Sequence, residues 1–298
     1  MLANFLFRAT RKAHHLTEKL HAWAQNRWHP AIRAQYRARG RIPLTAGYVE
    51  ERAWFVEQQF QSNECMTGFA VALPGFLPQG YGVGLDERCI EWPWAMAHLG
   101  DATRILDAGS ALNHPHILSL PIWRGRKLDI FTLAPETACE WQRGISYLYG
   151  DLRQLPYRSE EFDCVISIST LEHVGMDNSA FSGQEKHKEH ATEDILLVLA
   201  EWRRILKPGG CLLLTVPYGR YEDHGIFQQF DAHLLDRCAR HFAPAKRKDI
   251  FFLYSEKGWQ AVEQTDCTQA VYAIDAPRKP EPDRAAAARA VSCCQWWI

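Results

Sequence analysis

The chain lacks the features that mark secreted, metal-binding and membrane-spanning proteins. Its nine cysteines include no C-x-x-C pair and no histidine partners at zinc spacing, which argues against a disulfide framework or a structural metal. No apolar run approaches the roughly 20 residues that a membrane span needs. The apolar opening MLANFLF has no basic segment before it and no cleavage site of a signal peptide. These absences favour a cytoplasmic protein without a metal.

The net charge is also close to zero, at −1 over 298 residues, but the charged residues are unevenly distributed along the chain. The first 41 residues carry nine Lys or Arg against the single acid Glu18. As a helix, this segment has an imperfect apolar stripe with basic flanks. One interpretation is a surface for an anionic membrane or a protein partner, which would make the protein peripheral to the membrane. The other is a solvated helix packed on the main domain. Nucleic-acid binding is not expected, because no recognised binding module surrounds the cluster.

Four zones follow from the composition, which at 47% hydrophobic is enough for a sizeable core. Residues 1–60 are predicted to be a basic helical extension, and residues 61–88 a Gly/Pro-rich loop or lid. The catalytic unit is expected over residues 89–275. Residues 276–298 are predicted to be a mobile tail with an apolar end that could dock on the body of the protein or on a neighbour.

Short apolar runs alternate with helical segments in the central zone, which predicts an α/β fold with a mostly parallel, Rossmann-like sheet and helices on both faces. A helix is predicted over about 190–206, where Ile195, Leu199, Trp202 and Leu206 share a face, and it ends at Lys-Pro-Gly-Gly. Seven strands are expected, the last of them antiparallel, over residues 104–108, 127–133, 145–149, 162–168, 211–216, 249–254 and 268–274.

Residues 150–174, GDLRQLPYRSEEFDCVISISTLEHV, join an acidic turn, a buried strand and a carboxylate–imidazole pair. In open α/β sheets, ligands bind at the carboxyl ends of the strands. The residues that follow this strand, Ser169, Thr170, Glu172 and His173, are therefore predicted to lie at a nucleotide-like cofactor site. A turn at Gly109, directly after the strand RILDA, would let the backbone approach a ligand closely.

Together with Lys207-Pro208-Gly209-Gly210, these motifs make the chain resemble a class I S-adenosylmethionine-dependent methyltransferase, of the methyltransferase domain 11 type that acts on small molecules and glycans. The resemblance is clear over residues 100–218 and looser to about 275. It implies that S-adenosyl-L-methionine is the cofactor. It assigns the adenine to Asp151 and Leu152. The cofactor residues that it implies are Asp107, Ala108, Gly109, Ser110, Ala111, Asn113, Thr132, Glu136, Asp151, Leu152 and Ser169.

The sequence departs from the family pattern at two places. Two of the three glycines in the loop after the first strand are replaced, by Ala111 and Asn113, although Asn113 can adopt a left-handed conformation and offers a side-chain amide. Thr132 stands where similar enzymes hold the ribose with an acid, and a threonine cannot accept two hydroxyl hydrogen bonds as a carboxylate does. Glu136 is favoured as a substitute over Asp129, which falls early in its strand.

His173 and Glu172 are the predicted catalytic pair, because an imidazole at the mouth of the site can take a proton from an acceptor hydroxyl. The alternative is that the pair only shapes the strand end. Further acceptor-side candidates are Asp177, Asn178, His187, His190, Tyr218 and His224.

We therefore expect a methyltransferase that acts on an oxygen of a small-molecule or saccharide acceptor. Two alternatives stay open from the sequence: an interaction module that keeps the fold without catalysis, and a nicotinamide-dependent oxidoreductase, whose cofactor also rests on a strand–glycine–helix turn.

Overall fold

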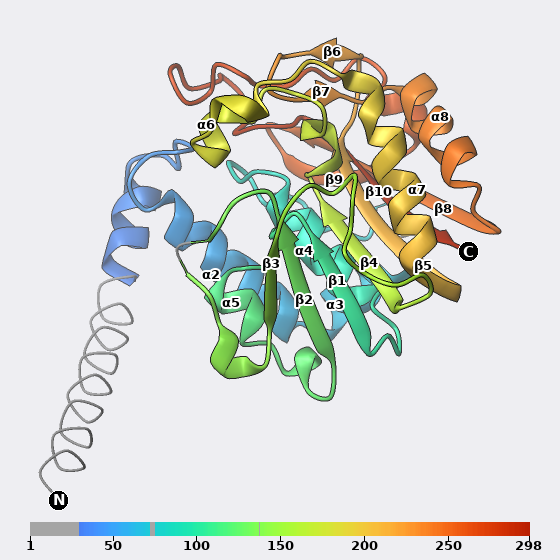
Figure 1. The fold of residues 1–298 in the computed structure, drawn as a ribbon. Coiled ribbons are helices and arrows are strands. Elements are labelled where there is room, and N and C mark those ends of the chain that lie inside the picture. Colours follow the sequence, from blue (N-terminus) through green and yellow to red (C-terminus); the bar gives the residue numbers. More distant parts are fainter. Residues whose placement is uncertain (1–29, 72–74, 137) are drawn as a thin grey trace, which may run out of the picture.

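The computed structural model describes residues 30–71, 75–136 and 138–298 of the chain. An eight-stranded sheet forms its centre, in the order β3-β2-β1-β4-β5-β10-β8-β9 (Figure 1). The first five strands in this order are parallel, and the last three pair antiparallel. The strands are β1 (Arg104–Ala108), β2 (Lys127–Thr132), β3 (Ser146–Tyr149), β4 (Phe162–Ile168), β5 (Leu206–Pro217), β8 (Lys246–Ser255), β9 (Gly258–Val262) and β10 (Ala290–Trp297). A two-stranded ribbon, β6 (Glu222–Asp223) and β7 (Gln228–Gln229), stands apart.

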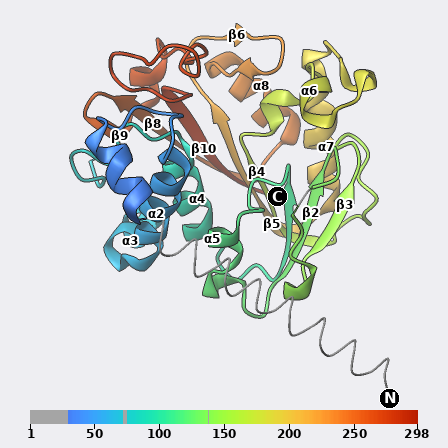
Figure 2. The same ribbon diagram turned by 90° about the vertical axis from the view of Figure 1, so that its left-hand side faces the viewer.

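Helices cover both faces of the sheet, as Figures 1 and 2 show from two directions. One layer holds α2 (Tyr48–Gln61), α3 (Asn63–Val71), α4 (Arg88–Ala97) and α5 (Pro115–Leu118), and residues 30–38 are also helical. The other layer holds α7 (Ile195–Ile205) and α8 (Ala232–Phe242), while the short α6 (Ser179–Ser182) lies in the segment between β4 and α7. Short 3-10 turns span Pro121–Trp123, Trp141–Arg143, Leu171–His173, Glu185–His187, Thr192–Asp194 and Gln264–Cys267.

The two layers explain why the central strands are apolar almost throughout. Successive residues of a strand point to opposite faces, so Ile105 and Ile166 pack under α4 while Leu106 and Val165 pack under α7. With both faces covered, a strand has no side that favours polar residues. The predicted α/β fold class is confirmed, as are the first five predicted strands and the helix that ends before Lys-Pro-Gly-Gly.

The count of seven strands and the treatment of the C-terminal tail are wrong. Residues 268–274, predicted to be a strand, form turns and irregular structure. The tail instead supplies β10, which lies between β5 and β8 and pairs with both along its length. Val291 and Cys293 face one layer and Cys294 and Trp296 the other, and all four are fully buried. The apolar end of the chain is therefore a central strand of the sheet.

The loop predicted over residues 61–88 is wrong in part, because residues 63–71 form α3. Phe69 on this helix is fully buried and packs against Phe76, Tyr81 and Phe252. Tertiary packing of this aromatic cluster outweighs the weak helical signal of NECMTGFAV.

Residues 1–29 of the basic N-terminal segment lie outside the described residues. Within the described part, Arg37 donates to Glu51 at 2.8 Å and its guanidinium lies 4.7 Å from the ring centre of Trp54. The membrane or partner contact predicted for this segment stays a prediction. Over the described residues we find no helix with the length and apolar character that crossing a membrane would require.

Candidate active site

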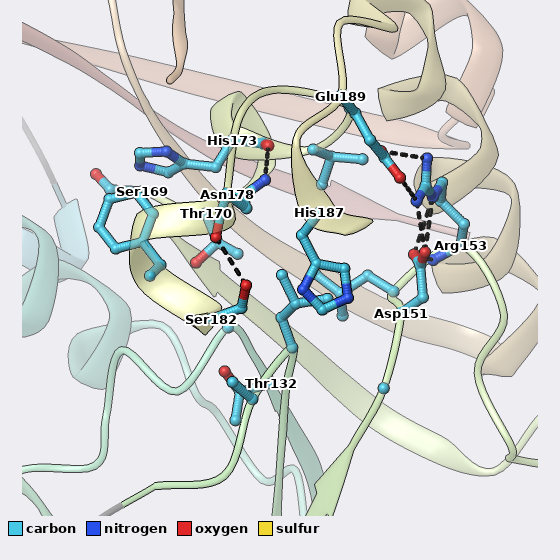
Figure 3. A pocket seen from close by; sticks show the side chains of 18 of the residues that line it. Thr132, Asp151, Arg153, Ser169, Thr170, His173, Asn178, Ser182, His187 and Glu189 are labelled. Atoms are coloured by element: carbon cyan, nitrogen blue, oxygen red, sulfur yellow. Dashed lines mark hydrogen bonds and ion pairs between the residues drawn. The ribbon is translucent and has the colours of Figure 1, made fainter. Parts of the chain in front are cut away.

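A cavity of about 450 Å³ opens at the carboxyl ends of β1 to β4. That volume lies within the range of about 300–1,000 Å³ typical of small-molecule sites. The loops that follow these four strands all line the cavity. Residues of the segment between β4 and α7 line it as well (Figure 3). The lining residues that the sequence predicted are Gly109, Thr132, Glu136, Asp151, Leu152, Ser169, Thr170, His173, Asn178 and His187.

The loop after β1 is shaped by Gly109 and Asp107. Gly109 has a φ of 127°, and a Cβ atom there would lie 2.1 Å from Oγ1 of Thr170. The glycine thus lets the loops after β1 and β4 touch at the floor of the cavity. Asp107 is fully buried, does not line the cavity, and accepts a hydrogen bond from the backbone N–H of Leu112 at 2.9 Å. Burial raises the pKa of Asp107 to about 7, and its role here is to hold the turn.

Gly109→Ala is expected to lower the free energy of unfolding by about 2–4 kcal/mol, from backbone strain and the clash with Thr170. Gly144→Ala is the matched control, since Gly144 has a φ of 77° but no atom within 4 Å of the added Cβ. Chemical denaturation of both variants measures the difference. Equal losses would show that close approach to Thr170 is unimportant.

The other predicted residues of this loop do not line the cavity. Asn113 does not use the left-handed conformation open to it, and Ser110 is left-handed, with a φ of 65°. The Asn113 amide donates to the carbonyl of Ala138 at 2.9 Å and accepts from the Tyr147 hydroxyl at 2.9 Å, so it joins two loops. Ala108 is fully buried, and the Ala111 carbonyl accepts from Trp92. None of their side chains lines the cavity, and their assignment to the cofactor stays a prediction.

The loop after β2 brings two residues to the cavity. Thr132 ends β2, and Glu136 lines the same cavity four residues later. Asp129, the alternative acid, is held by Arg104 through hydrogen bonds of 2.6 and 2.7 Å near the start of β1 and does not line this cavity. The geometry therefore favours Glu136 over Asp129 as the acid available near Thr132.

Asp151 follows β3 and is bound tightly by Arg153. The guanidinium of Arg153 donates to Asp151 at 2.6–3.0 Å, to Glu189 at 2.9 Å and to Asp194 at 2.5 Å. Burial acts to raise the pKa of Asp151, but the hydrogen bonds from Arg153 outweigh it and lower that pKa overall. Asp151 is thus ionised at neutral pH, and Arg153 ties it to the segment that precedes α7. Neither Arg153 nor Glu189 was among the residues predicted from the sequence.

His173 lines the cavity from the 3-10 turn after β4. Its Nδ1 lies 2.7 Å from the carbonyl oxygen of Ile226. Because a carbonyl only accepts hydrogen bonds, Nδ1 carries the proton in the neutral ring and Nε2 holds the free lone pair. Burial lowers the pKa of His173, so the ring is neutral at pH 7.

Glu172 differs from its neighbour. It is 2% exposed, lies outside the lining of the cavity, and burial raises its pKa well above the ordinary range. Its buried carboxyl group is therefore not placed to take a proton from an acceptor in the cavity. The prediction of Glu172 as a catalytic partner is therefore wrong, because the 3-10 turn directs successive side chains apart.

Two residues of α4 reach the site without having been predicted. Arg88 lines the cavity and forms an ion pair with the fully buried Glu91. Glu91 also accepts hydrogen bonds of 2.6 Å from the hydroxyls of Ser169 and Thr215, at the ends of β4 and β5. The signal in the sequence was a lone carboxylate in the apolar run CIEWPWAMA, since a buried charge is rare unless paired.

Two of the six further acceptor-side candidates line the cavity, and four do not. Asn178 and His187 line the cavity, and Figure 3 shows His187 between Ser182 and Asp151. The remaining four make other contacts. Asp177 accepts a hydrogen bond from the Ser179 amide at 3.0 Å, and His190 pairs with Asp223 at 2.9 Å. Tyr218 packs on Phe251, and His224 packs on Phe227.

Residues 127–214 match the model of the methyltransferase domain family. This range runs from β2 through most of β5, and so includes Thr132, Asp151 and His173. The chain carries a class I S-adenosylmethionine-dependent methyltransferase domain. S-adenosylmethionine is the cofactor of this domain, and the predicted resemblance is confirmed.

The chain is similar to a stretch of tRNA (carboxymethyluridine(34)-5-O)-methyltransferase from Arabidopsis thaliana, with 31% identity over 88 residues. That stretch is 30% of this chain and 18% of the plant protein, so the match spans less than a fifth of the relative's length.

Two solved structures are also similar. One is a methyltransferase of Thermotoga maritima described as a possible histamine N-methyltransferase, with 16% identity, a TM-score of 0.44, and coverage of 82% of this chain and 99% of that one. The other is phosphoethanolamine N-methyltransferase 2 of Haemonchus contortus in complex with S-adenosyl-L-methionine, with 16% identity, a TM-score of 0.37, and coverage of 49% and 34%.

Proposed function

We propose that the protein transfers the methyl group of S-adenosylmethionine to an oxygen of a small-molecule or saccharide acceptor. The observation that carries this proposal is the meeting of four loops, those after β1, β2, β3 and β4, around one cavity that also contains the His173 imidazole.

The residues around the cavity suit the cofactor. Asp151 and Leu152 are proposed to bind the adenine, and Thr132 with Glu136 the ribose, while Gly109 leaves room for the rest of the molecule. When bound, S-adenosylmethionine supplies an activated methyl group on a positively charged sulfur. The carboxylates of Glu136, Asp151 and Glu189 outnumber the two arginines of the lining, Arg88 and Arg153, and the resulting negative charge favours such a cation.

His173 is proposed to be the general base. Its Nε2 lone pair is the one left free by the hydrogen bond from Nδ1 to Ile226, and a hydroxyl acceptor must lose its proton as it attacks. The relative from Arabidopsis thaliana, whose name describes transfer to oxygen, supports an oxygen acceptor. Alignment of the acceptor contributes the rest of the acceleration.

The acceptor side of the cavity supports a hydroxylated molecule. Asn178 and Ser182 offer polar side chains, and Phe181, which is 65% exposed, offers a ring on which a sugar or base could lie. A modified uridine in RNA is a second candidate, favoured by the name of the plant relative. Incubation with radiolabelled S-adenosylmethionine and separate pools of saccharides, small hydroxylated metabolites and tRNA distinguishes the two. Label in tRNA alone would overturn the first candidate.

Asp151→Ala is expected to weaken binding of S-adenosylmethionine by about 1–3 kcal/mol, the contribution of a hydrogen bond to a charged group. Arg153 keeps Glu189 and Asp194 as partners in this variant, so the fold should persist. Asp194→Asn is the control, because Asp194 also binds Arg153 but does not line the cavity. Calorimetric titration that gave equal affinities for wild type and Asp151→Ala would remove Asp151 from the site.

A further inference from the structure

Two arginines line the described cavity, and they differ in how many of their N–H groups are used. All five N–H groups of Arg153 have acceptors: Nε–H donates to Asp151, and the two terminal nitrogens donate to Asp151, Glu189 and Asp194. This guanidinium is saturated by three carboxylates. It has no donor left for a ligand.

Arg88 has donors left. One terminal nitrogen donates to Glu91, and its Nε and its other terminal nitrogen form no hydrogen bond with any of the described residues. The side chain is 23% exposed and lines the cavity. Its remaining N–H groups are therefore available on the cavity side.

The guanidinium of Arg88 is held in place by Glu91. Glu91 is fully buried and is itself held by the hydroxyls of Ser169 and Thr215 at 2.6 Å each. The carboxylate thus anchors Arg88 to Thr215 of β5 and to Ser169, which follows β4 and lines the cavity. A guanidinium held in this way loses little conformational freedom when it binds a second anion.

S-adenosylmethionine and its product S-adenosylhomocysteine carry one anionic group, the α-carboxylate of the amino-acid tail. The carboxylates of Glu136, Asp151 and Glu189 that line the cavity repel it, and the charge of Arg153, the second cation of the lining, is already engaged by Asp151, Glu189 and Asp194. We propose that Arg88 binds this α-carboxylate through its unused N–H groups and so selects ligands that carry an amino-acid tail. This inference rests on the proposed cofactor binding, and it gives α4 a direct part in the site.

With Asp151 at the adenine end, Arg88 would hold the opposite end of the same molecule. Fixing both ends sets the position of the sulfur between them, and alignment of the methyl group is the main requirement of an in-line displacement. Arg88 is a binding and positioning residue in this account and takes no part in proton transfer.

The test compares S-adenosylhomocysteine with 5′-methylthioadenosine, which has the same adenosine and thioether but no amino-acid tail. Calorimetry on the wild type is expected to show a marked preference for S-adenosylhomocysteine. In Arg88→Gln this preference should shrink by about 10- to 100-fold, the effect of losing a charge-assisted hydrogen bond, while the affinity for 5′-methylthioadenosine stays the same. An unchanged ratio of the two affinities would overturn the inference. Failure of the wild type to bind either ligand would overturn the proposed function itself.

Two further variants guard against an effect of misfolding. Arg88→Gln leaves the charge of Glu91 buried and unpaired, which is destabilising, so the double variant Arg88→Gln, Glu91→Gln removes both charges together and should show the same loss of preference. Arg52→Gln is the matched control, because Arg52 pairs with Asp86 in the same layer but does not line the cavity. A loss of preference in Arg52→Gln as large as that in Arg88→Gln would contradict a direct contact.

Discussion

Trp296→Ala is expected to lower the free energy of unfolding by about 3–5 kcal/mol, the usual loss for a large aromatic side chain removed from a core. Trp296 is fully buried, stacks on Phe242 of α8 with ring centres 5.6 Å apart, and donates from its indole N–H to Asp249 at 2.8 Å. Because proteins of this kind are stable by about 5–15 kcal/mol in total, the loss should be plain in chemical denaturation.

Trp297 provides a control on the neighbouring position. Successive residues of a strand face opposite sides of the sheet, and Trp297 is only partly buried, with Lys246 lying 4.7 Å from its ring centre. Trp297→Ala is therefore expected to cost less than about 1–2 kcal/mol, the range for a partly exposed site that loses one cation–π contact. Equal and small losses for both variants would mean that the C-terminal strand is not part of the sheet.

His173→Ala is expected to lower the turnover number by about 10²–10⁴-fold, the range in which a positioned general base contributes. The affinity for S-adenosylmethionine should change little, because the base acts on the acceptor. The measurement is steady-state turnover with the acceptor found by the radiolabel screen, beside calorimetry with the cofactor. His190→Ala is the control, since His190 is exposed and pairs with Asp223 away from the cavity.

The pH dependence of the turnover number is a second test of His173 as the general base. A base works only when unprotonated, and burial favours the neutral ring by lowering its pKa. The turnover number should therefore fall as the pH drops through that pKa, with the inflection below the ordinary histidine value of about 6.5. His173→Ala should lose this inflection. A His173→Ala variant that keeps the inflection of the wild type, or one that is as active as the wild type, would leave the imidazole with a structural role.

The sequence predicted the parts of the fold whose signal is local. The parallel strands are continuous apolar runs, because helices cover both faces, and α7 has a clear period with a Pro-Gly stop. The position of β10 could not be found in this way. It follows a proline-rich segment and an alanine run, and what makes Cys293 and Trp296 a central strand is pairing with β5 and β8, which are distant in the sequence.

The candidate site was predicted where it depends on strand ends and missed where it depends on remote elements. Gly109, Asp151 and His173 each lie in the loop that follows a parallel strand, so topology alone brings them together. Arg88 lies on a helix before the first strand, and Arg153 matters through Glu189 and Asp194, some 40 residues away. Such contacts depend on packing between layers, which periodicity does not encode. The Glu172 prediction failed because a 3-10 turn separates adjacent side chains into core and cavity.

We propose that the loops after β1 to β4 form one site for S-adenosylmethionine. Isothermal titration of the full chain with S-adenosylmethionine and S-adenosylhomocysteine tests it most directly. We predict saturable binding of one equivalent of each ligand, weakened in Asp151→Ala and unaffected in Asp194→Asn. No detectable heat at millimolar cofactor, with the protein shown to be folded, would contradict this proposal. It would favour an interaction module that keeps the methyltransferase fold without catalysis.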